Sequence, residues 1–221
     1  MRIDELFPPE VIDEDIRKTL GDVGKAGLAG LMGAAILATP TNKKYDDANT
    51  ANSPFAQEVK ILANTMWGEA RNLGTEGMNA VGHVIKNRAE MNVPRFGEGI
   101  KGVALKRKQF SCWNPSDPNR EKIAEMRKIE FYFKTKQPPA GEKSFEDWEK
   151  KFKSSPQFGE YRAWLEAYDL AKNILLNKSR DTTKGALFYH TKGTQPYWAK
   201  GIKPITADSS HVFYKTVKQA N

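Results

Sequence analysis

The chain has 221 residues, and its 39% hydrophobic content is enough for a real core, so the composition indicates a globular domain with charged additions. Lysine and arginine exceed aspartate and glutamate by 35 to 27. The net charge of +8 favours polyanionic partners such as nucleic acid, anionic lipid or acidic cell-envelope polymers. The single cysteine, Cys112, excludes an internal disulfide and leaves the cellular compartment open.

Composition divides the N-terminal part of the chain into three segments. Residues 1–25 are acidic, the reverse of the n-region of a signal peptide. Residues 26–38 form an uncharged run of mostly Gly and Ala, shorter than the roughly 20 residues that span a bilayer as a helix. This run is expected to pack on a partner, to act as an atypical export signal or to insert in a membrane under special circumstances; a flexible or partner-bound tail is equally open. Residues 39–54 are polar and turn-rich, which predicts a linker.

A folded domain is predicted over residues 55–221, beginning with two helices. Apolar residues recur at three- and four-residue steps from Val59 to Met66, which places Glu69 on or beside the same buried face. The residues Asn72, Gly74 and Gly77 are expected to break this helix. A second helix is predicted from near Met78 to Arg88, packed against the first with Glu69 near the turn.

The remaining elements are predicted to be two helices and a small sheet. Residues 119–133 are expected to be helical, and the charged stretch 134–157 looks like an insertion. Residues 161–175 carry an aromatic stripe at helical spacing, which predicts a core-facing helix. Residues 185–190 and 211–215 are aromatic and β-branched enough to form strands. Helices first and an antiparallel sheet near the C-terminus indicate an α+β domain.

Glu69 is the candidate catalytic residue, because an apolar helical stretch ends there and delivers a carboxylate beside Trp67. A general acid working near neutral pH needs a carboxyl whose ionised form is disfavoured by apolar surroundings. The alternative is an ordinary carboxylate at a helix end, paired with Arg71 or Arg88.

Short sequence blocks around Glu69 and further along the chain follow one another at compatible spacing over about residues 57–215. The blocks are Met66-Trp67-Gly68-Glu69-Ala70-Arg71, Glu76-Gly77, Val84-Ile85-Lys86-Asn87-Arg88, Gln109-Phe110-Ser111-Cys112-Trp113, Gly185-Ala186-Leu187-Phe188-Tyr189-His190, Tyr197-Trp198 and His211-Val212-Phe213-Tyr214. In this order they resemble the cell-wall hydrolases typified by the spore-cortex-lytic enzymes of spore-forming bacteria, a family that also occurs in phages. The chain departs from the family pattern at Asn72, where a glycine is usual, and at residues 208–210, where an Ile-Gly pair is usual. Residues 134–157 are also longer than the family leads one to expect.

The resemblance implies a mainly helical fold similar to lytic transglycosylases and goose-type lysozymes, and an enzyme that cleaves peptidoglycan between N-acetylmuramic acid and N-acetylglucosamine. The family's catalytic glutamate maps onto Glu69, which would act first as acid and then as base. A lytic transglycosylase needs only this one carboxyl and no cofactor or metal. Muramidase-type hydrolysis remains the alternative, with Glu76 as the nearest candidate for a second carboxylate.

Chemistry and resemblance together provide candidates for contacts with the glycan: rings that can stack on sugar faces, and side chains that can hydrogen-bond acetamido or hydroxyl groups. The stacking candidates are Tyr189, Trp198 and Phe110. The hydrogen-bonding candidates are Gln109, His190 and His211. Each is equally compatible with a role in the core or behind the substrate-contacting residues.

Other classes of function remain open at the level of sequence. A zinc-dependent amidase would use His83, His190, His211 and Cys112, although no short His-x-His or His-x-x-x-His spacing occurs. A thiol nucleophile at Cys112, paired with one of these histidines, is a further alternative to its role as a small buried hydrophobe. A non-catalytic glycan- or nucleic-acid-binding module would use the positive charge, but no aromatic-basic nucleic-acid motif appears, so no specific nucleic acid is expected as partner.

The expected setting is the bacterial cell envelope, with peptidoglycan as partner. An acidic start followed by a Gly/Ala-rich run fits a phage-encoded enzyme, either a virion component or a lysis protein. Residues 1–38 would then contact a membrane or a virion or envelope protein. An exported bacterial remodelling enzyme is the alternative.

Overall fold

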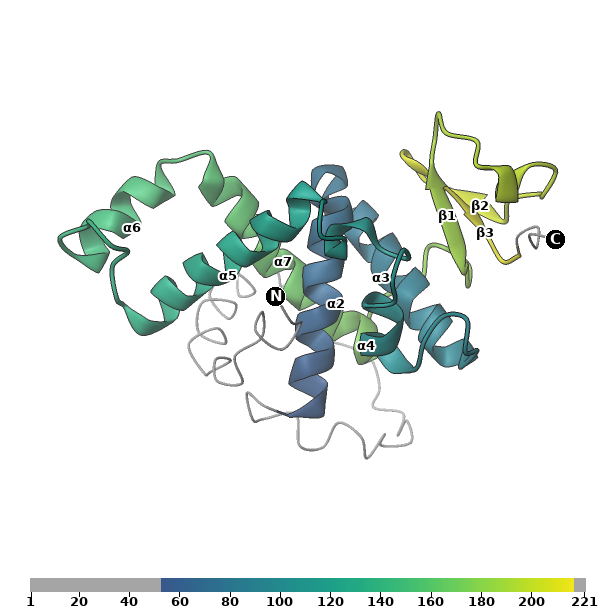
Figure 1. The fold of residues 1–221 in the computed structure, drawn as a ribbon, viewed down its shortest axis with the longest axis horizontal. Helices are drawn as coiled ribbons and strands as arrows, with labels where there is room; N and C mark the ends of the chain where they lie inside the picture. Colours follow the sequence, from purple (N-terminus) through teal and green to yellow (C-terminus); the bar gives the residue numbers. More distant parts are fainter. Residues whose placement is uncertain (1–52, 217–221) are drawn as a thin grey trace, which may run out of the picture. The chain divides into compact units, whose positions relative to one another are not determined.

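The computed structural model describes residues 53–216 (Figure 1). The predicted segments 1–25 and 26–38 and nearly all of the linker lie outside these residues. Within the described range, no helix is both long and apolar enough to cross a membrane.

The described chain divides into two compact units. The larger comprises residues 59–123 and 159–216, and the smaller comprises residues 53–58 and 124–158. The helices, in chain order, are α2 (Pro54–Ala70), α3 (Gly74–Met91), α4 (Gly99–Ala104), α5 (Pro118–Thr135), α6 (Phe145–Lys153) and α7 (Gln157–Leu175). Three 3-10 turns, η3 (Arg71–Leu73), η4 (Ser111–Trp113) and η5 (Tyr197–Ala199), lie between the regular elements. This order of elements confirms the helices predicted after Phe55.

The predicted position of the break between the first two helices was wrong by several residues. α3 begins at Gly74 rather than near Met78, and Gly77 lies inside its first turn. A Cβ atom at Gly77 would collide with the Leu73 side chain, so glycine allows the helix to start directly after η3. The prediction treated Gly77 as a residue that ends a helix. In the structure it instead allows the backbone of α3 to lie close to the Leu73 side chain.

The core of the larger unit is formed by the facing sides of α2, α3 and α7. Trp67 and Trp164 are both 0% exposed and meet edge to face, with ring centroids 5.4 Å apart. The stripe predicted to face the core on α7 is confirmed by the burial of Tyr161, Trp164, Tyr168, Ala171 and Leu175. Burial of each large side chain contributes on the order of 1.5–3 kcal/mol.

The sheet has three antiparallel strands in the order β1-β3-β2. The strands are β1 (Phe188–Thr191), β2 (Thr206–Ala207) and β3 (His211–Tyr214). Tyr189 pairs with Phe213, and Thr191 pairs with His211. The α+β class and the small C-terminal sheet are therefore confirmed, while β2, only two residues long, had too little sequence pattern to be predicted.

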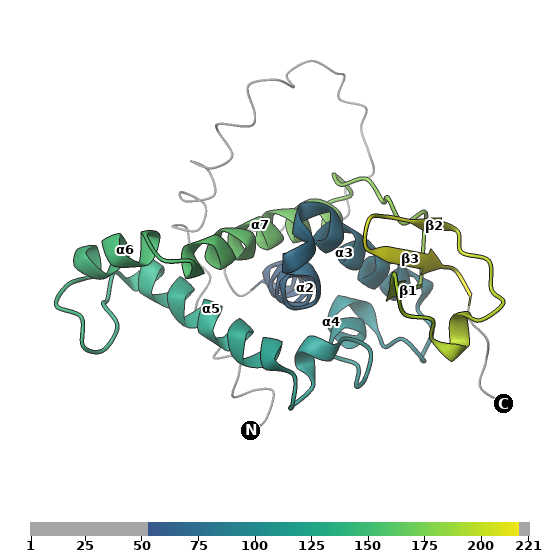
Figure 2. The same cartoon turned by 90° about the horizontal axis from the view of Figure 1, so that it is seen from above.

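Helix α3 packs against the sheet through a small apolar cluster. Its buried members are Ala80, Val84, Ala186 and Phe213, with Tyr189 and Ile205 packed against them. Figures 1 and 2 both show α3 running between α2 and the sheet. The sheet is therefore fixed to the same helix that follows Glu69 in the chain.

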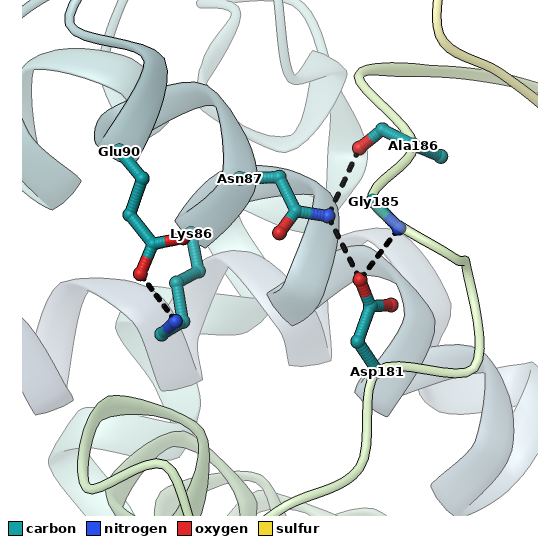
Figure 3. Close-up of polar contacts among 6 residues, drawn as sticks. All are labelled: Lys86, Asn87, Glu90, Asp181, Gly185 and Ala186. Carbon is teal, nitrogen blue, oxygen red and sulfur yellow. Dashed lines mark hydrogen bonds and ion pairs between the residues drawn. The ribbon is translucent and has the colours of Figure 1, made fainter.

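A polar contact beside this cluster fixes the entry to the sheet. Nδ2 of Asn87 on α3 donates to Oδ2 of Asp181 at 3.1 Å and to the carbonyl oxygen of Ala186 at 3.2 Å (Figure 3). The N–H of Gly185 donates to the same Asp181 oxygen at 2.8 Å. Gly185 has φ +76°, a left-handed conformation that favours glycine.

The smaller unit has an aromatic core of its own. The Phe133 ring lies 5.3 to 5.7 Å from those of Phe145, Trp148 and Phe152, and the Trp148 ring lies 5.5 Å from Phe145 and 5.2 Å from Phe152. Phe158 lies 5.8 Å from Phe152. The hydroxyl of Ser144 accepts from the N–H of Asp147 and caps α6. The charged stretch 134–157 therefore contains a capped helix, α6, which packs within this core.

We expect Asp181→Asn to lower the free energy of unfolding by about 1 kcal/mol at neutral pH, or roughly 2–4 °C in Tm, because a half-exposed carboxylate is partly screened by solvent. Burial acts to raise the pKa of Asp181, but hydrogen bonds from Thr183, Asn87 and the N–H of Gly185 outweigh it and lower the pKa. The stabilisation is thus present above the ordinary value of 3.8 and is lost as the pH falls through the folded-state value.

Thermal unfolding measured from neutral pH to below 3.8 should show the Tm difference between wild type and Asp181→Asn closing at the acid end. Asp169→Asn, at an exposed position on α7, is the control and should change Tm little throughout. A Tm difference that stays constant with pH would contradict the lowered pKa of Asp181 in the folded state.

Candidate active site

Glu69 is the penultimate residue of α2 and is half-buried. Its Oε1 atom accepts a hydrogen bond from the N–H of Cys112 at 2.7 Å and one from the hydroxyl of Ser111 at 3.3 Å. Among the described residues, Oε2 accepts no hydrogen bond from the protein. One oxygen of the carboxylate is therefore fixed and the other is left for a ligand.

The turn η4, which supplies both donors, is held on α2 by two further contacts. Nε1 of Trp113 donates to the hydroxyl of Thr65 at 3.0 Å. Gly68 lies so close to the turn that a Cβ atom there would stand 2.7 Å from Cβ of Cys112. Since residues 65, 68 and 69 lie on one side of a helix, a single face of α2 holds the whole turn.

The surroundings of Glu69 are partly apolar, as expected, and partly polar. The neighbouring Trp67 is 0% exposed, but Glu69 itself accepts hydrogen bonds from two polar donors. The alternative of an ion pair with an arginine is not found in the described part of the chain. Nη1 of Arg71 donates to Asn119 at 2.9 Å, with the guanidinium 4.2 Å from the Trp67 ring, and Arg88 bonds elsewhere.

Arg88 places a buried positive charge behind the site. It is 7% exposed, its Nε donates to the carbonyl oxygen of Leu187 at 2.6 Å and its Nη1 donates to Oε1 of Gln109 at 2.9 Å. Burial lowers the pKa of Arg88 to about 10, so the side chain remains protonated at neutral pH. The rings of Phe96, Phe110 and Phe188 lie 5.3 to 5.5 Å from its guanidinium.

Two of the predicted substrate-contacting residues, the half-buried Gln109 and the buried Phe110, lie against Arg88. Gln109 uses its amide to link Arg88 with the carbonyl oxygen of Arg95, at 2.9 and 3.0 Å. Phe110 is 1% exposed, so neither face of its ring is open to a sugar. The contacts of both residues support Arg88 and the turn that follows Phe110.

Tyr189 is a residue of strand β1 whose hydroxyl interacts electrostatically with Glu69. Burial raises the pKa of its hydroxyl, and the nearby charge of Glu69 raises it further, so the hydroxyl stays protonated and can donate a hydrogen bond. The ring of His211, 4% exposed, meets the Tyr189 ring edge to face at 5.0 Å. Nδ1 of His211 lies 3.6 Å from Oδ2 of Asp208, whose other oxygen accepts from the N–H of His211 at 2.5 Å. This arrangement makes His211 a support for Tyr189.

His190 and Trp198 belong to a second aromatic group on the sheet. Nε2 of His190 and the hydroxyl of Tyr214 are 3.0 Å apart, and the two rings stack at 5.5 Å. The Trp198 ring lies 5.7 Å from that of His190 and 5.6 Å from that of Tyr214. Both predicted residues are half-buried, so part of each remains accessible.

Cys112 and His83 lie in surroundings that suit structural roles. Cys112 is 0% exposed, and burial together with the adjacent Glu69 charge raises the pKa of its thiol, which disfavours the nucleophilic thiolate. Burial lowers the pKa of His83, and its Nε2 lies 3.2 Å from the hydroxyl of Ser179. In residues 53–216, no three His, Cys, Asp or Glu side chains are grouped as ligands for a metal ion. The set proposed for a zinc amidase is therefore not brought together.

Comparison with known proteins assigns the chain to a family. The sequence pattern of the cell wall hydrolase family matches residues 73–214, more than half of the chain. The chain belongs to the cell wall hydrolase family. The matched range contains Arg88, Cys112, Tyr189 and His211 but begins after Glu69, whose assignment rests on the site geometry and the Met66–Arg71 block.

One cell wall hydrolase relative is the spore cortex-lytic enzyme of Bacillus subtilis (strain 168), which is 34% identical over 77 residues. The aligned part is 34% of this chain and 25% of that protein, so the chain spans about a quarter of the relative's length. No solved structure matches the chain.

Sequence reasoning missed the buried cation and the two donors to Glu69. Arg88 does have a sequence signal, because it continues the spacing of Val81, Val84 and Ile85 on the apolar face of α3. A charge at such a position is almost always paired or hydrogen-bonded when buried. The N–H of Cys112 has no signal, since every residue but proline has this donor.

Gly68→Ala is expected to lower both stability and activity, because the new methyl group would push η4 away from α2. The loss of stability should be about 1–3 kcal/mol, as is usual for overpacking. The variant Gly68→Ala/Cys112→Gly removes the colliding atoms of Cys112 but keeps its N–H, and should recover part of both quantities. Gly159→Ala is the control, since no atom lies within 4 Å of a Cβ at that position. Equal stability of Gly68→Ala and Gly159→Ala would contradict the close contact.

The buried thiol gives a separate test of the nucleophile alternative. Cys112 should react with iodoacetamide only after unfolding, because burial and the Glu69 charge keep the thiol protonated and covered. Cys112→Ala keeps the N–H that bonds Glu69 and should retain most of the wild-type rate of cell-wall lysis. Mass spectrometry of labelled protein and a turbidity assay measure the two outcomes, and loss of lysis in a folded Cys112→Ala protein would restore the thiol hypothesis.

Proposed function

We propose that this cell wall hydrolase cleaves the glycan strands of peptidoglycan between N-acetylmuramic acid and N-acetylglucosamine, with Glu69 as its one catalytic carboxyl. The observation that carries the proposal is that the two oxygens of this carboxylate have different surroundings. Oε1 accepts from Cys112 and Ser111, and Oε2 accepts no hydrogen bond from the described residues. Family membership and the match to a spore cortex-lytic enzyme support a cell-wall substrate.

The acid step begins with the proton on Oε2 of Glu69. Transfer of this proton to the glycosidic oxygen lets the bond break through an oxocarbenium-like state and leaves Glu69 ionised. The hydrogen bonds from Cys112 and Ser111 strengthen as the negative charge develops, so they stabilise the transition state more than the protonated ground state. The buried charge of Arg88 acts in the same direction, through its field.

The base step decides the product. If ionised Glu69 takes the proton of the sugar's own 6-hydroxyl, the product is an anhydro sugar and the enzyme is a lytic transglycosylase. If it takes a proton from water, the product is a reducing end. A conventional glycosidase uses a second carboxylate near the first, whereas Glu76, the nearest candidate in sequence, is exposed in the first turn of α3. This favours the transglycosylase route.

Contacts with the glycan are proposed for the accessible groups of the sheet. Tyr189 would donate its hydroxyl near the reacting bond, and Trp198 and His190 would contact neighbouring sugars with their accessible parts. His211 acts through Tyr189, and Gln109 and Phe110 act through Arg88, so these three are proposed as positioning residues. The place of action is the bacterial envelope, and a phage origin, as virion component or lysis protein, is part of the proposal.

Purified peptidoglycan digested by wild type, Glu69→Gln and Glu76→Gln tests the proposal by mass spectrometry of the products. Wild type and Glu76→Gln should release anhydromuramyl ends, and Glu69→Gln should release less than about one hundredth as much, the usual cost of losing a catalytic acid–base group. Thermal unfolding should show that Glu69→Gln is folded. Reducing muramyl ends would mean hydrolysis, and released intact peptides would mean an amidase. Full activity of Glu69→Gln would contradict the proposal that Glu69 is the catalytic carboxyl.

A further inference from the structure

Tyr197 is the most exposed large apolar side chain among the described residues, at 71%. It begins η5, whose next residues are anchored: Trp198 lies 5.6 Å from the Tyr214 ring and Ala199 is 6% exposed. The N–H of Ala199 donates to the carbonyl oxygen of Pro196 at 3.0 Å. A fixed turn thus presents an exposed ring, and a backbone that is already ordered loses little conformational entropy on binding.

The loop around this ring, residues 192–205, is positively charged. It contains Lys192, Lys200 and Lys203 and no acidic residue, and all three lysines are exposed. In residues 53–216, none of the three forms an ion pair, whereas Lys151 of the smaller unit lies 2.7 Å from Glu142. The positive charge of these three lysines is therefore available to pair with an anionic partner.

The acid that follows the loop forms no ion pair with a lysine in residues 53–216. Asp208 is half-buried, and its Oδ1 accepts from the N–H groups of Ser210 at 2.7 Å and His211 at 2.5 Å. Its Oδ2 lies 3.6 Å from Nδ1 of His211. The carboxylate is used to shape the turn before β3.

The loop is connected to the candidate active site through Trp198, but Tyr197 and the three loop lysines are not among the residues assigned to that site. Tyr189 packs on the cluster between α3 and the sheet, and its neighbour His190 packs on Trp198 of η5. Successive residues of a strand face opposite sides, so β1 separates the two groups. A polymer held at the loop would leave the Glu69 carboxylate free for another part of the same polymer.

We propose that residues 192–205 form an accessory binding site for the peptide-bearing part of peptidoglycan, with Tyr197 packed on a sugar ring and the three loop lysines paired with carboxylates of the peptide stems. The inference rests on the proposed function, because it assumes a peptidoglycan substrate. Sugar rings offer apolar faces to an aromatic ring, and uncross-linked stems end in carboxylates. A neutral glycan such as chitin offers only the first, so the site favours strands that carry stems.

Binding to peptidoglycan sacculi in a Glu69→Gln background tests the site without cleavage. The sacculi are stripped of phosphate polymers and used in two forms, with stem carboxylates intact or converted to neutral amides. Tyr197→Ala should raise the half-saturating protein concentration on both forms by roughly fivefold or more, as for a well-packed interface residue. Lys192→Gln/Lys200→Gln/Lys203→Gln should weaken binding only to the intact form, and increasing salt should reduce the difference.

Lys128→Gln/Lys143→Gln/Lys150→Gln is the matched control, since it removes the same charge from exposed positions of the smaller unit. The control should bind both forms like the parent, and thermal unfolding should show all variants folded. Equal weakening by the two triple variants, or unchanged binding by Tyr197→Ala, would overturn the site. So would loop variants that lose binding to anionic lipid vesicles but not to sacculi.

Cleavage assays with Glu69 restored separate the two proposals. If the wild type releases anhydromuramyl ends but the loop variants bind sacculi as the parent does, the accessory site alone is overturned. Absence of any glycan cleavage by the wild type overturns the proposed function, whatever the loop variants bind.

Discussion

The hydrogen bond between Oε1 of Glu69 and the N–H of Cys112 is the contact on which the rest of the site depends. A donor on the main chain can reach a helix side chain at 2.7 Å only if the two backbones approach closely. Gly68 allows that approach because it has no Cβ, and Trp113 holds the far side of the turn on Thr65. Packing thus fixes the orientation of the carboxylate before any substrate arrives, and an oriented group needs no reorganisation when charge develops.

A buried cation organises the layer behind the carboxylate. Burying Arg88 is costly unless its donors are satisfied, and here they meet Leu187 and Gln109, with aromatic rings over the guanidinium. Leu187 directly precedes β1, so the same side chain connects α3 to the strand that carries Tyr189. The contact between Asn87 and Asp181 fixes the chain a few residues earlier. Two adjacent residues of α3, Asn87 and Arg88, therefore fix the start of the sheet on this helix.

The larger unit brings together three parts of the chain that are far apart in sequence, namely the end of α2, the turn η4 and strand β1. Each part is held by its own contacts: the core under Trp67, the glycine contact at η4 and the cluster around Phe213. The departures from the family pattern have structural counterparts. Asp208 shapes the turn before β3, and residues 134–157 build most of a separate aromatic core, so neither disturbs the hydrogen bonds of Glu69.

The sequence by itself determined the α+β class, four of the six described α-helices, two of the three described strands, the candidate glutamate and the family; α4 and α6 were not predicted. It could do so because helical and strand periodicity and short ordered blocks are local properties of the chain. The burial and contacts of Gln109, Phe110 and Cys112 came only from the tertiary structure, since identical side chains can contact a sugar or lie beneath one. The two donors to Glu69 also came from the fold, because a backbone N–H is the same at every position and only packing decides which one meets a carboxylate. Burial of Arg88 lies between these cases: its spacing placed it on the apolar face, but only the fold supplied the partners that make a buried charge stable.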